Sequence, residues 1–545
     1  MGLYFEKRWS NTAVFLLLTA AFLLIYLPWF SCERELFREE CVYAVEAMEC
    51  HSGSFLPVTA HGEAVYTSAP LFPMMTAGLR TLTGWPIETI MRGISMLMLA
   101  AGAVLVYFAA ASQRTVQAGI VAAAVYLTPL IALEKVVEGN PATTSGFFLL
   151  AAQLLFFYYG IRRSNWNMAW IISAFLIALG FLSGGVSILI LFIAPMFFFR
   201  RPLSVKSKFN APGFAVAVLL LISVVIAWAI PYFRQTGNAV YDIWLDNFRF
   251  DNGKYFLELL EFPLLLPIRL LPWTLIAWLP FCVALQDLDK TPIFSRYLRT
   301  LFFVSLALIW LFFDFEARAI LFLLGPLSIL TGITYELGTR RYGEKIRKLL
   351  PLGGILTVIL TAAFVAVKFL PDRFLTMFLR LNNSLTFRHT AFFSISMGIG
   401  CFLLVLLLLF LLAGRRKQPL WIMLLVIVVS CGVFYGGVMK PYRSQLTPKR
   451  RLGNDLRRVL EQAGGKKLYK VGIRDLYGEL FYTGMKVVKL REIRELPAEE
   501  EVVFLLGTEF PGTADRSWQN LLPSGYTYNK HPLSLWKGVL RPRDE

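Results

Sequence analysis

The chain has 545 residues, of which 57% are hydrophobic and only 17% are charged, and its formal net charge is +18. Soluble domains contain about 45–50% apolar and about 25% charged residues, so a soluble protein of this composition could not cover its own apolar surface. A soluble enzyme, a nucleic-acid-binding protein and a secreted disulfide-linked domain are therefore excluded. The composition indicates a polytopic helical membrane protein, with the lipid bilayer as a partner and no nucleic acid.

The apolar residues are grouped in runs that approach the roughly 20 residues a helix needs to cross the hydrocarbon core. We predict about thirteen transmembrane helices. Their approximate ranges are 11–30, 91–111, 115–133, 146–161, 167–182, 185–199, 212–231, 263–286, 300–313, 318–335, 349–370, 391–413 and 419–438. The first run follows Lys7 and Arg8 but has no small-residue cleavage site after it, so we expect it to remain as an anchor.

Basic residues are concentrated in alternate loops, and this predicts the orientation. The basic loops are 162–163, 200–208, 290–299, 340–348 and 415–417. By the positive-inside rule these loops face the cytoplasm, so the N-terminus is inside and, after an odd number of spans, the C-terminal segment is outside. The opposite loops are longer and more acidic, at 31–90, 134–145, 232–262 and 371–390. We expect the functional site on this outer face.

The composition changes after about residue 440. Residues 468–473 and 501–506 are expected to form buried strands, and residues 454–464 an amphipathic helix. The chain is thus divided into a transmembrane domain over 1–439, with large outer loops at 31–90 and 232–262, and a small α/β domain over 440–545 outside the membrane.

Two adjacent carboxylates, Glu39 and Glu40, follow the first apolar run at the expected start of a helix. Acidic residues in a first turn are favoured by the helix dipole, so the pair could be an ordinary helix start. The alternative is a general base or a metal ligand at a cavity on the membrane face. The spacing alone leaves both interpretations open.

The carboxylate pair belongs to the first of three motifs in this loop. The first motif begins Arg-Glu-Glu-Cys-Val-Tyr-Ala at residue 38 and ends at Met48. The second is a Gly-containing turn at 51–57, and the third is Gly-Glu-Ala-Val-Tyr-Thr-Ser-Ala-Pro-Leu-Phe-Pro at 62–73. In this order they resemble the first periplasmic loop of the GT-C glycosyltransferases that use polyprenyl-phosphate sugars. This superfamily includes the aminoarabinose transferase acting on lipid A and the protein O-mannosyltransferases. Shorter segments at 180–185, 246–250 and 270–273 resemble later motifs of the same proteins.

The resemblance implies a GT-C fold: an all-α polytopic membrane protein of about thirteen helices with a small C-terminal α/β periplasmic domain. It implies a bacterial inner-membrane enzyme that moves a sugar, with inversion, from a polyprenyl-phosphate donor to a lipid A-like lipid, a glycan or a protein. Glu39 aligns with the catalytic Asp of the family. The predicted substrate-binding residues are Glu40, Tyr43, Tyr66, Glu138, Arg249, Lys254 and Arg269.

The chemistry of such a transfer suits these residue types. A polyprenyl phosphate is a good leaving group, so the enzyme must orient an acceptor hydroxyl, remove its proton and stabilise the departing phosphate. A carboxylate serves the first two tasks and Arg or Lys the third. Further cationic candidates are Arg318 and Arg388. For each cation, contact with the interface or with a lipid headgroup is the alternative.

The sequence also departs from the family pattern. Val42 replaces an Arg, Thr67 and Ser68 replace a Glu-Lys pair, and Gly184 replaces a Lys. The residues that bind metal and lipid phosphate in some relatives are therefore missing, so no metal ligand is assigned and a divalent metal stays open. The alternatives are a transporter or flippase of a lipid-linked substrate and an inactive homologue. The clustering of charges in loops favours surface chemistry over transport.

The first loop also contains two histidines and three cysteines. His51 and His61 are ten residues apart, which is not a recognised zinc-ligand spacing, so we expect solvated loop histidines. Cys32, Cys41 and Cys50 share this polar loop, and a disulfide among them stays open.

The orientation can be tested with reporter fusions. Alkaline phosphatase fused after Lys440 should be active, because the positive-inside rule places this point outside. A fusion after Arg163, in a basic loop, should be inactive. Activity of a cytoplasm-dependent reporter after Lys440 would contradict the orientation and the location of the site together.

Overall fold

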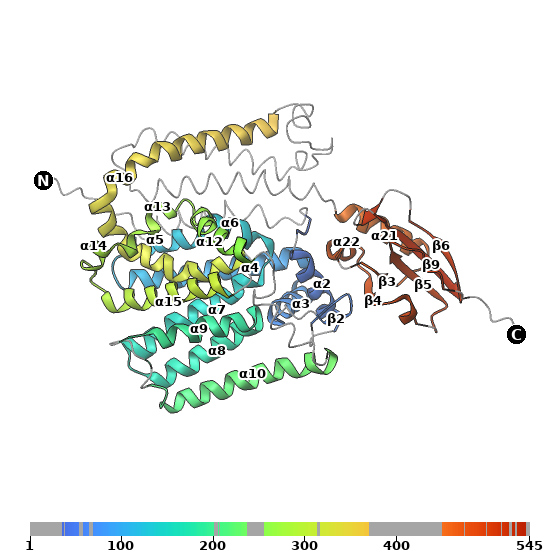
Figure 1. The fold of residues 1–545 in the computed structure, drawn as a ribbon, viewed down its shortest axis with the longest axis horizontal. Helices are drawn as coiled ribbons and strands as arrows, with labels where there is room; N and C mark the ends of the chain where they lie inside the picture. Colours follow the sequence, from blue (N-terminus) through green and yellow to red (C-terminus); the bar gives the residue numbers. More distant parts are fainter. Residues whose placement is uncertain are drawn as a thin grey trace.

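The computed structural model shows a bundle of helices with a sheet-containing unit at one end (Figure 1). It describes residues 35–37, 39–53, 58–64, 69–200, 205, 208–236, 255–312, 317–369, 449–473, 475–497, 499–513, 515–522, 526–528 and 531–540. The predicted spans at 11–30, 391–413 and 419–438 lie outside the described residues.

Six helices of the described chain are long and apolar enough to cross a membrane, or up to eight if each of two bent pairs counts as one span. The six are α4 (Ile87–Ala111), α7 (Pro141–Phe156) with its extension η3 (Phe157–Arg162), α8 (Trp166–Gly184), α10 (Pro212–Thr236), α15 (Pro292–Leu311) and α16 (Leu321–Phe369). The chain is therefore a multi-pass membrane protein, as predicted. The total of about thirteen spans stays a prediction.

Several predicted spans differ from the helices of the structure. The run at 115–133 is broken at Pro129 into α5 (Val116–Leu127) and α6 (Leu130–Lys135), which continues as η2 (Val136–Glu138); the two halves are bent by 48°. Pro129 accounts for the break, because a proline has no N–H to donate and its ring clashes with the preceding turn, which kinks or ends a helix. The run at 263–286 is also interrupted; it comprises the end of α12 (Tyr255–Arg269), then α13 (Thr274–Ala277), η6 (Leu279–Phe281) and α14 (Val283–Gln286).

The runs at 318–335 and 349–370 were expected to be separate spans joined by a basic loop. The structure has continuous helix over α16, preceded by the short helix η7 (Ala317–Ile320). Figure 1 shows that α16 changes direction along its course. Lys and Arg are good helix formers, so a basic segment need not interrupt a helix. The predicted run at 185–199 is the shorter helix α9 (Val186–Phe198).

Polar side chains fix the starts of three helices. Thr115 caps α5 by accepting a hydrogen bond from the Ala118 amide, Asn140 caps α7, and Asn165 caps α8. Each side-chain oxygen satisfies a backbone amide that has no partner inside its helix. Pro141 then occupies the first position of α7, where a missing N–H costs nothing.

The segment before α4, which contains the loop predicted to face outward, is itself folded. It contains α2 (Glu40–His51), a short hairpin of β1 (Thr59–Ala60) and β2 (Glu63–Ala64), and α3 (Leu71–Thr83). Residues of α2, α3 and the first turns of α4 share one apolar cluster, in which Phe72 and Met91 are fully buried. This packing fixes α2 on the end of α4, so the adjacent carboxylates at the start of α2 have defined positions.

The C-terminal unit is a five-stranded mixed sheet in the order β4-β3-β5-β9-β6. The strands are β3 (Lys467–Val471), β4 (Lys486–Leu490), β5 (Val502–Gly507), β6 (Arg516–Asn520) and β9 (Ser534–Leu540). Strand β3 pairs in parallel with β4 and β5, and β9 pairs antiparallel with β5 and β6. The predicted strands at 468–473 and 501–506 correspond to β3 and β5.

Two helices complete this unit. The predicted helix at 454–464 is α21 (Lys449–Gln462), which buries Leu452, Leu456 and Leu460 against the sheet. These leucines recur every four residues and therefore lie on one face of the helix. The shorter α22 (Tyr477–Phe481) packs against both α21 and α2, so it joins the C-terminal unit to the first outer loop.

The hairpin of the first loop also docks on the edge strand β4. The carbonyl of His61 accepts a hydrogen bond of 2.9 Å from the Lys489 amide, and Lys489 Nζ lies 2.6 Å from Glu63 Oε2. The His61 ring is 1% exposed and stacks on Tyr477 with 4.8 Å between ring centroids. The expectation of a solvated His61 is therefore wrong, because the C-terminal unit covers the turn. His51, in contrast, is exposed.

Burial of His61 predicts that the stability of the docked hairpin depends on pH. Burial, with smaller contributions from Lys470 and Lys489, lowers the pKa of His61 to about 2. The folded state therefore binds the proton more weakly than the unfolded state, and stability is lost as the pH falls below the ordinary value of about 6.5. Between pH 7 and pH 5 the loss should be about 2 kcal/mol.

The test is hydrogen–deuterium exchange of the Lys489 amide at several pH values, because this amide donates to the His61 carbonyl in the docked hairpin. His61→Asn is the control, because Asn does not titrate and tolerates the positive φ of 57° at this position. Burial raises the pKa of the neighbouring Glu49, so protonation of Glu49 stabilises the folded state as the pH falls. This contribution is present in both the wild type and the His61→Asn variant. Equal pH dependence of the wild type and the variant would refute the role of His61.

Candidate functional site

Glu39 lies at the N-cap of α2 with 37% of its side chain exposed. Its Oε2 atom is 3.4 Å from Nη1 of Arg318, which comes from η7 at the start of α16. The same Nη1 donates to the hydroxyl of Tyr43, one turn further along α2. The Tyr43 ring is held edge-on against Phe72 at 6.2 Å. A half-exposed carboxylate, a guanidinium and a phenol thus meet at the end of the bundle that contacts the C-terminal unit.

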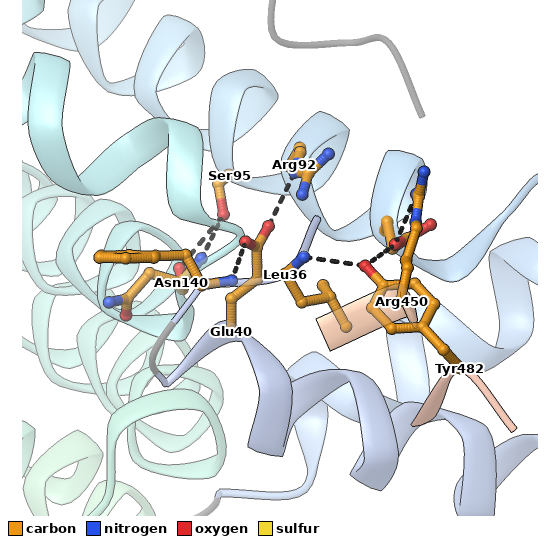
Figure 2. Close-up of polar contacts among 9 residues, drawn as sticks. Leu36, Glu40, Arg92, Ser95, Asn140, Arg450 and Tyr482 are labelled. Atoms are coloured by element: carbon orange, nitrogen blue, oxygen red, sulfur yellow. Dashed lines mark hydrogen bonds and ion pairs between the residues drawn. The ribbon is translucent and has the colours of Figure 1, made fainter. Parts of the chain in front are cut away.

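Glu40 points the other way, into the protein. It is 1% exposed, and its Oε1 atom accepts from Nε of Arg92 at 2.7 Å, with neither side chain accessible to solvent. Its Oε2 atom accepts from the Phe37 amide at 3.2 Å, which closes the start of the helix. Figure 2 shows the carboxylate of Glu40 facing Arg92 on α4. Successive residues of a helix differ by about 100°, which explains how the two neighbours face different environments.

The C-terminal unit contributes to the same region. The Tyr482 hydroxyl accepts from the Leu36 amide at 2.8 Å and donates to Glu88 Oε1 at 2.7 Å. Arg450 Nη2 lies 3.3 Å from the same Glu88 oxygen (Figure 2). Burial raises the pKa of Tyr482, so the phenol remains a hydrogen-bond donor at any physiological pH. These contacts tie the segment before Glu39 to the first turn of α4.

A second polar group lies on α6 and η2. Lys135 Nζ is 3.3 Å from Glu138 Oε2, and both residues are buried. Arg269, at the end of α12, forms an ion pair with Glu134. Because α6 packs against η7, this group is on the same side of the bundle as Arg318.

The chain after Glu138 is pressed against α4 near Arg92. Gly139 has a φ of 48°, and a side chain there would come within 3.0 Å of Met91 Cβ. The next amide, of Asn140, donates to Ser95 Oγ at 2.9 Å (Figure 2). The close approach requires glycine and places the Glu138 group next to the buried Glu40–Arg92 pair.

The predicted site residues thus fall into three sets. Glu39, Glu40 and Tyr43 share α2, and Arg318 joins them. Glu138 and Arg269 belong to the neighbouring group, each with an ion-pair partner. The predicted residues outside the described part of the chain are Tyr66, Arg249, Lys254 and Arg388. The roles of all these residues stay predictions.

Sequence analysis identified neither Arg92 nor the contacts of Glu88. Arg92 and Glu88 lie inside or beside an apolar run. The partner of Arg92 is 52 residues away in the chain, and the partners of Glu88 are several hundred residues away. A charged residue within an apolar run is costly unless it is paired, and this is the one general signal that could have drawn attention to Arg92.

The described residues contain no group of three His, Cys, Asp or Glu side chains that could hold a metal ion. Cys41 and Cys50 are both free and buried, so they do not form a disulfide with each other. Burial raises the pKa of Cys41 to about 11, which keeps this thiol protonated and unreactive.

The buried pair predicts a specific mutational pattern. Glu40→Gln or Arg92→Met alone removes one partner of a buried ion pair and should cost about 3–5 kcal/mol. The double variant Glu40→Gln with Arg92→Met should recover much of this loss, since no charge is left unpaired. Thermal unfolding of the purified chain measures both effects. Arg457→Ala, in a largely exposed pair with Glu461, is the matched control and should cost less than about 1 kcal/mol. Single variants as mild as this control would contradict the pairing.

No protein-family model matches the chain, and no curated protein matches its sequence. The fold is similar to ArnT from Cupriavidus metallidurans bound to undecaprenyl phosphate, with a TM-score of 0.68, 14% identity and coverage of 97% of this chain and 98% of that one. The apo state of that ArnT has a TM-score of 0.67 and 13% identity, with coverage of 96% of this chain and 98% of that one. The apo oligosaccharyltransferase of Archaeoglobus fulgidus gives a TM-score of 0.50 and 11% identity, covering 90% of this chain and 65% of that one. The chain therefore has the same fold as this ArnT along almost its whole length, at low sequence identity.

Proposed function

We propose that this protein is a glycosyltransferase that moves a sugar from a polyprenyl-phosphate donor to an acceptor on the periplasmic face of a bacterial inner membrane. The single observation that carries the proposal is the contact between Glu39 and Arg318 at the outer end of the bundle. In this contact a solvent-accessible carboxylate lies beside a guanidinium, a group suited to binding phosphate. The GT-C fold supports the donor class, because the ArnT with this fold was solved with undecaprenyl phosphate.

The transfer is a single displacement at the anomeric carbon. Glu39 takes the proton of the acceptor hydroxyl, whose oxygen forms a bond to that carbon while the bond to the phosphate oxygen breaks. The polyprenyl phosphate leaves with the bonding electron pair, and Arg318 stabilises its negative charge. One displacement inverts the configuration of the sugar. The acceptor class is a lipid A-like lipid, a glycan or a protein.

The surrounding ion pairs have supporting roles in this proposal. The Glu40–Arg92 pair positions the helix that bears Glu39, while Lys135 and Arg269, each paired with a carboxylate, stabilise the neighbouring α6 and η2 segment. Tyr43 shares Arg318 with Glu39 and so sets the distance between base and phosphate site. The predicted contributions of Tyr66, Arg249 and Lys254 complete the donor site.

A flippase or transporter of a lipid-linked substrate is the second candidate. The bent pair formed by α5 and α6 favours it, because Glu134, Lys135 and Glu138 lie beyond the bend, and broken helices with charged residues are typical of transporters. Transporter sites, however, lie near the bilayer midplane. Gly139 contacts the second turn of α4, which places this charged group near the end of a span. The position favours chemistry at the surface.

The catalytic assignment predicts a large loss of activity in one variant. Glu39→Gln should lower transfer by about 10²–10⁴-fold, because the amide cannot accept the proton. Donor binding and folding should be nearly unchanged, since the side chain is partly exposed. Glu39→Asp should also lose activity, because the shorter side chain withdraws the base from the acceptor. Turnover is measured in membranes with a panel of polyprenyl-phosphate sugars and mass spectrometry of envelope lipids and glycans.

Glu63→Gln is the matched control. Glu63 lies in the same loop, is similarly exposed and also pairs with a cation, Lys489. Its substitution should leave the transfer rate unchanged within a small factor. An active Glu39→Gln protein would refute the base and favour the flippase or an inactive homologue.

A further inference from the structure

A second polar cluster lies at the other end of the bundle. Arg114 is in the turn between α4 and α5, Asp289 is in the turn between α14 and α15, and Arg299 is on α15. Arg114 follows Arg92 by 22 positions, which corresponds to about 33 Å along a helix. The cluster is therefore on the face opposite Glu39, in loops that the positive-inside rule assigns to the cytoplasm.

Both arginines point at one carboxylate without making a hydrogen bond to it. Arg114 Nη2 lies 3.6 Å from Asp289 Oδ1, and Arg299 Nη2 lies 3.6 Å from Asp289 Oδ2. The exposed fractions of the three side chains are 9% for Arg114, 18% for Arg299 and 1% for Asp289. Asp289 is instead held by the amide and hydroxyl of Thr291, at 2.9 Å and 3.1 Å.

Several buried atoms of this cluster have no hydrogen-bond partner in the described part of the chain. They are Nε and Nη2 of Arg114, Nε of Arg299 and Oδ2 of Asp289. A buried donor of a charged group that makes no hydrogen bond is costly, and such groups are normally satisfied. Nε and Nη2 of Arg114 form one edge of the guanidinium, and this edge matches two oxygens of a phosphate group.

The charge of the cluster also favours an anion. Two guanidinium groups and one carboxylate leave one excess positive charge, and Arg296 adds another one turn before Arg299. The turn that holds Arg114 joins two apolar helices, so it lies at the depth of lipid headgroups.

We propose that Arg114 and Arg299 bind a phosphate group on the face of the membrane opposite the Glu39 site. The Nε/Nη2 edge of Arg114 holds two phosphate oxygens and Arg299 Nε holds a third, while in the free protein Asp289 offsets the repulsion between the two guanidinium groups. The phosphate belongs either to an anionic phospholipid headgroup or to a soluble phosphate. This site is independent of the transfer reaction and does not depend on the proposed function.

Binding is measured on the full chain in detergent. Native mass spectrometry with phosphatidylglycerol, and with phosphatidylcholine as the zwitterionic comparison, reports lipid affinity; inorganic phosphate is added as a competitor. Phosphatidylglycerol should bind more tightly than phosphatidylcholine. Arg114→Gln should weaken phosphatidylglycerol binding about tenfold or more, because a bidentate charged contact is lost. Arg163→Gln is the control: this exposed arginine lies in another predicted cytoplasmic loop and stacks on Tyr158.

A second variant acts in the opposite direction. Asp289→Asn removes the negative charge but keeps an oxygen for Thr291, so it should tighten the binding of either anion. If the three residues form only a structural ion pair, Asp289→Asn will lower thermal stability without raising anion affinity, and the proposal fails.

The competition identifies the source of the phosphate. Displacement of phosphatidylglycerol by inorganic phosphate supports a site for phosphate from either source, and its absence supports the lipid headgroup. Binding of inorganic phosphate without lipid selectivity supports a soluble ligand. Equal affinities of the wild type, Arg114→Gln and Arg163→Gln for both probes would overturn the proposal.

Discussion

The buried ion pair between Glu40 and Arg92 is the contact on which the position of Glu39 depends. An unpaired arginine inside an apolar helix would be very costly, and the hydrogen-bonded carboxylate that α2 supplies to Arg92 lowers this cost at the buried start of α4. That pairing fixes the rotation of α2 about its axis. Glu39, the preceding residue, is then turned toward the surface and toward Arg318. A contact with no direct role in chemistry thereby decides which of two adjacent carboxylates can meet a substrate.

The C-terminal unit acts on the same helix from outside the bundle. Tyr482 joins the Leu36 amide to Glu88, and Glu88 is one turn from Arg92 on α4. The docked hairpin adds a second attachment through His61 and Lys489. Because both contacts reach the segments on either side of α2, the unit restrains the loop that carries Glu39 although no residue of its own is assigned to the chemistry.

The parts of this architecture that depend on local patterning could be predicted from the sequence. Long apolar runs located α4, α8 and α10, and short apolar runs located the buried strands β3 and β5, because these patterns are visible within a few residues. The break at Pro129 was missed because hydropathy averages over a proline. The partners of Glu40, His61 and Arg114 could not be predicted, since each contact joins segments separated by 52 to more than 400 residues. The family resemblance supplied Glu39, but not the helix rotation that exposes it.

The two ends of α4 show how one apolar helix can serve two polar environments. At the outer end Arg92 is enclosed and its charge is cancelled by a carboxylate at hydrogen-bond distance. Just beyond the other end, Arg114 lies 3.6 Å from a carboxylate that it shares with a second arginine. An arginine that is fully paired, as Arg92 is, can only stabilise the fold, because an anionic ligand would have to displace the paired carboxylate. A shared and incompletely neutralised charge retains an attraction for anions. The difference in pairing, rather than the residue type, therefore separates a structural arginine from one able to bind phosphate.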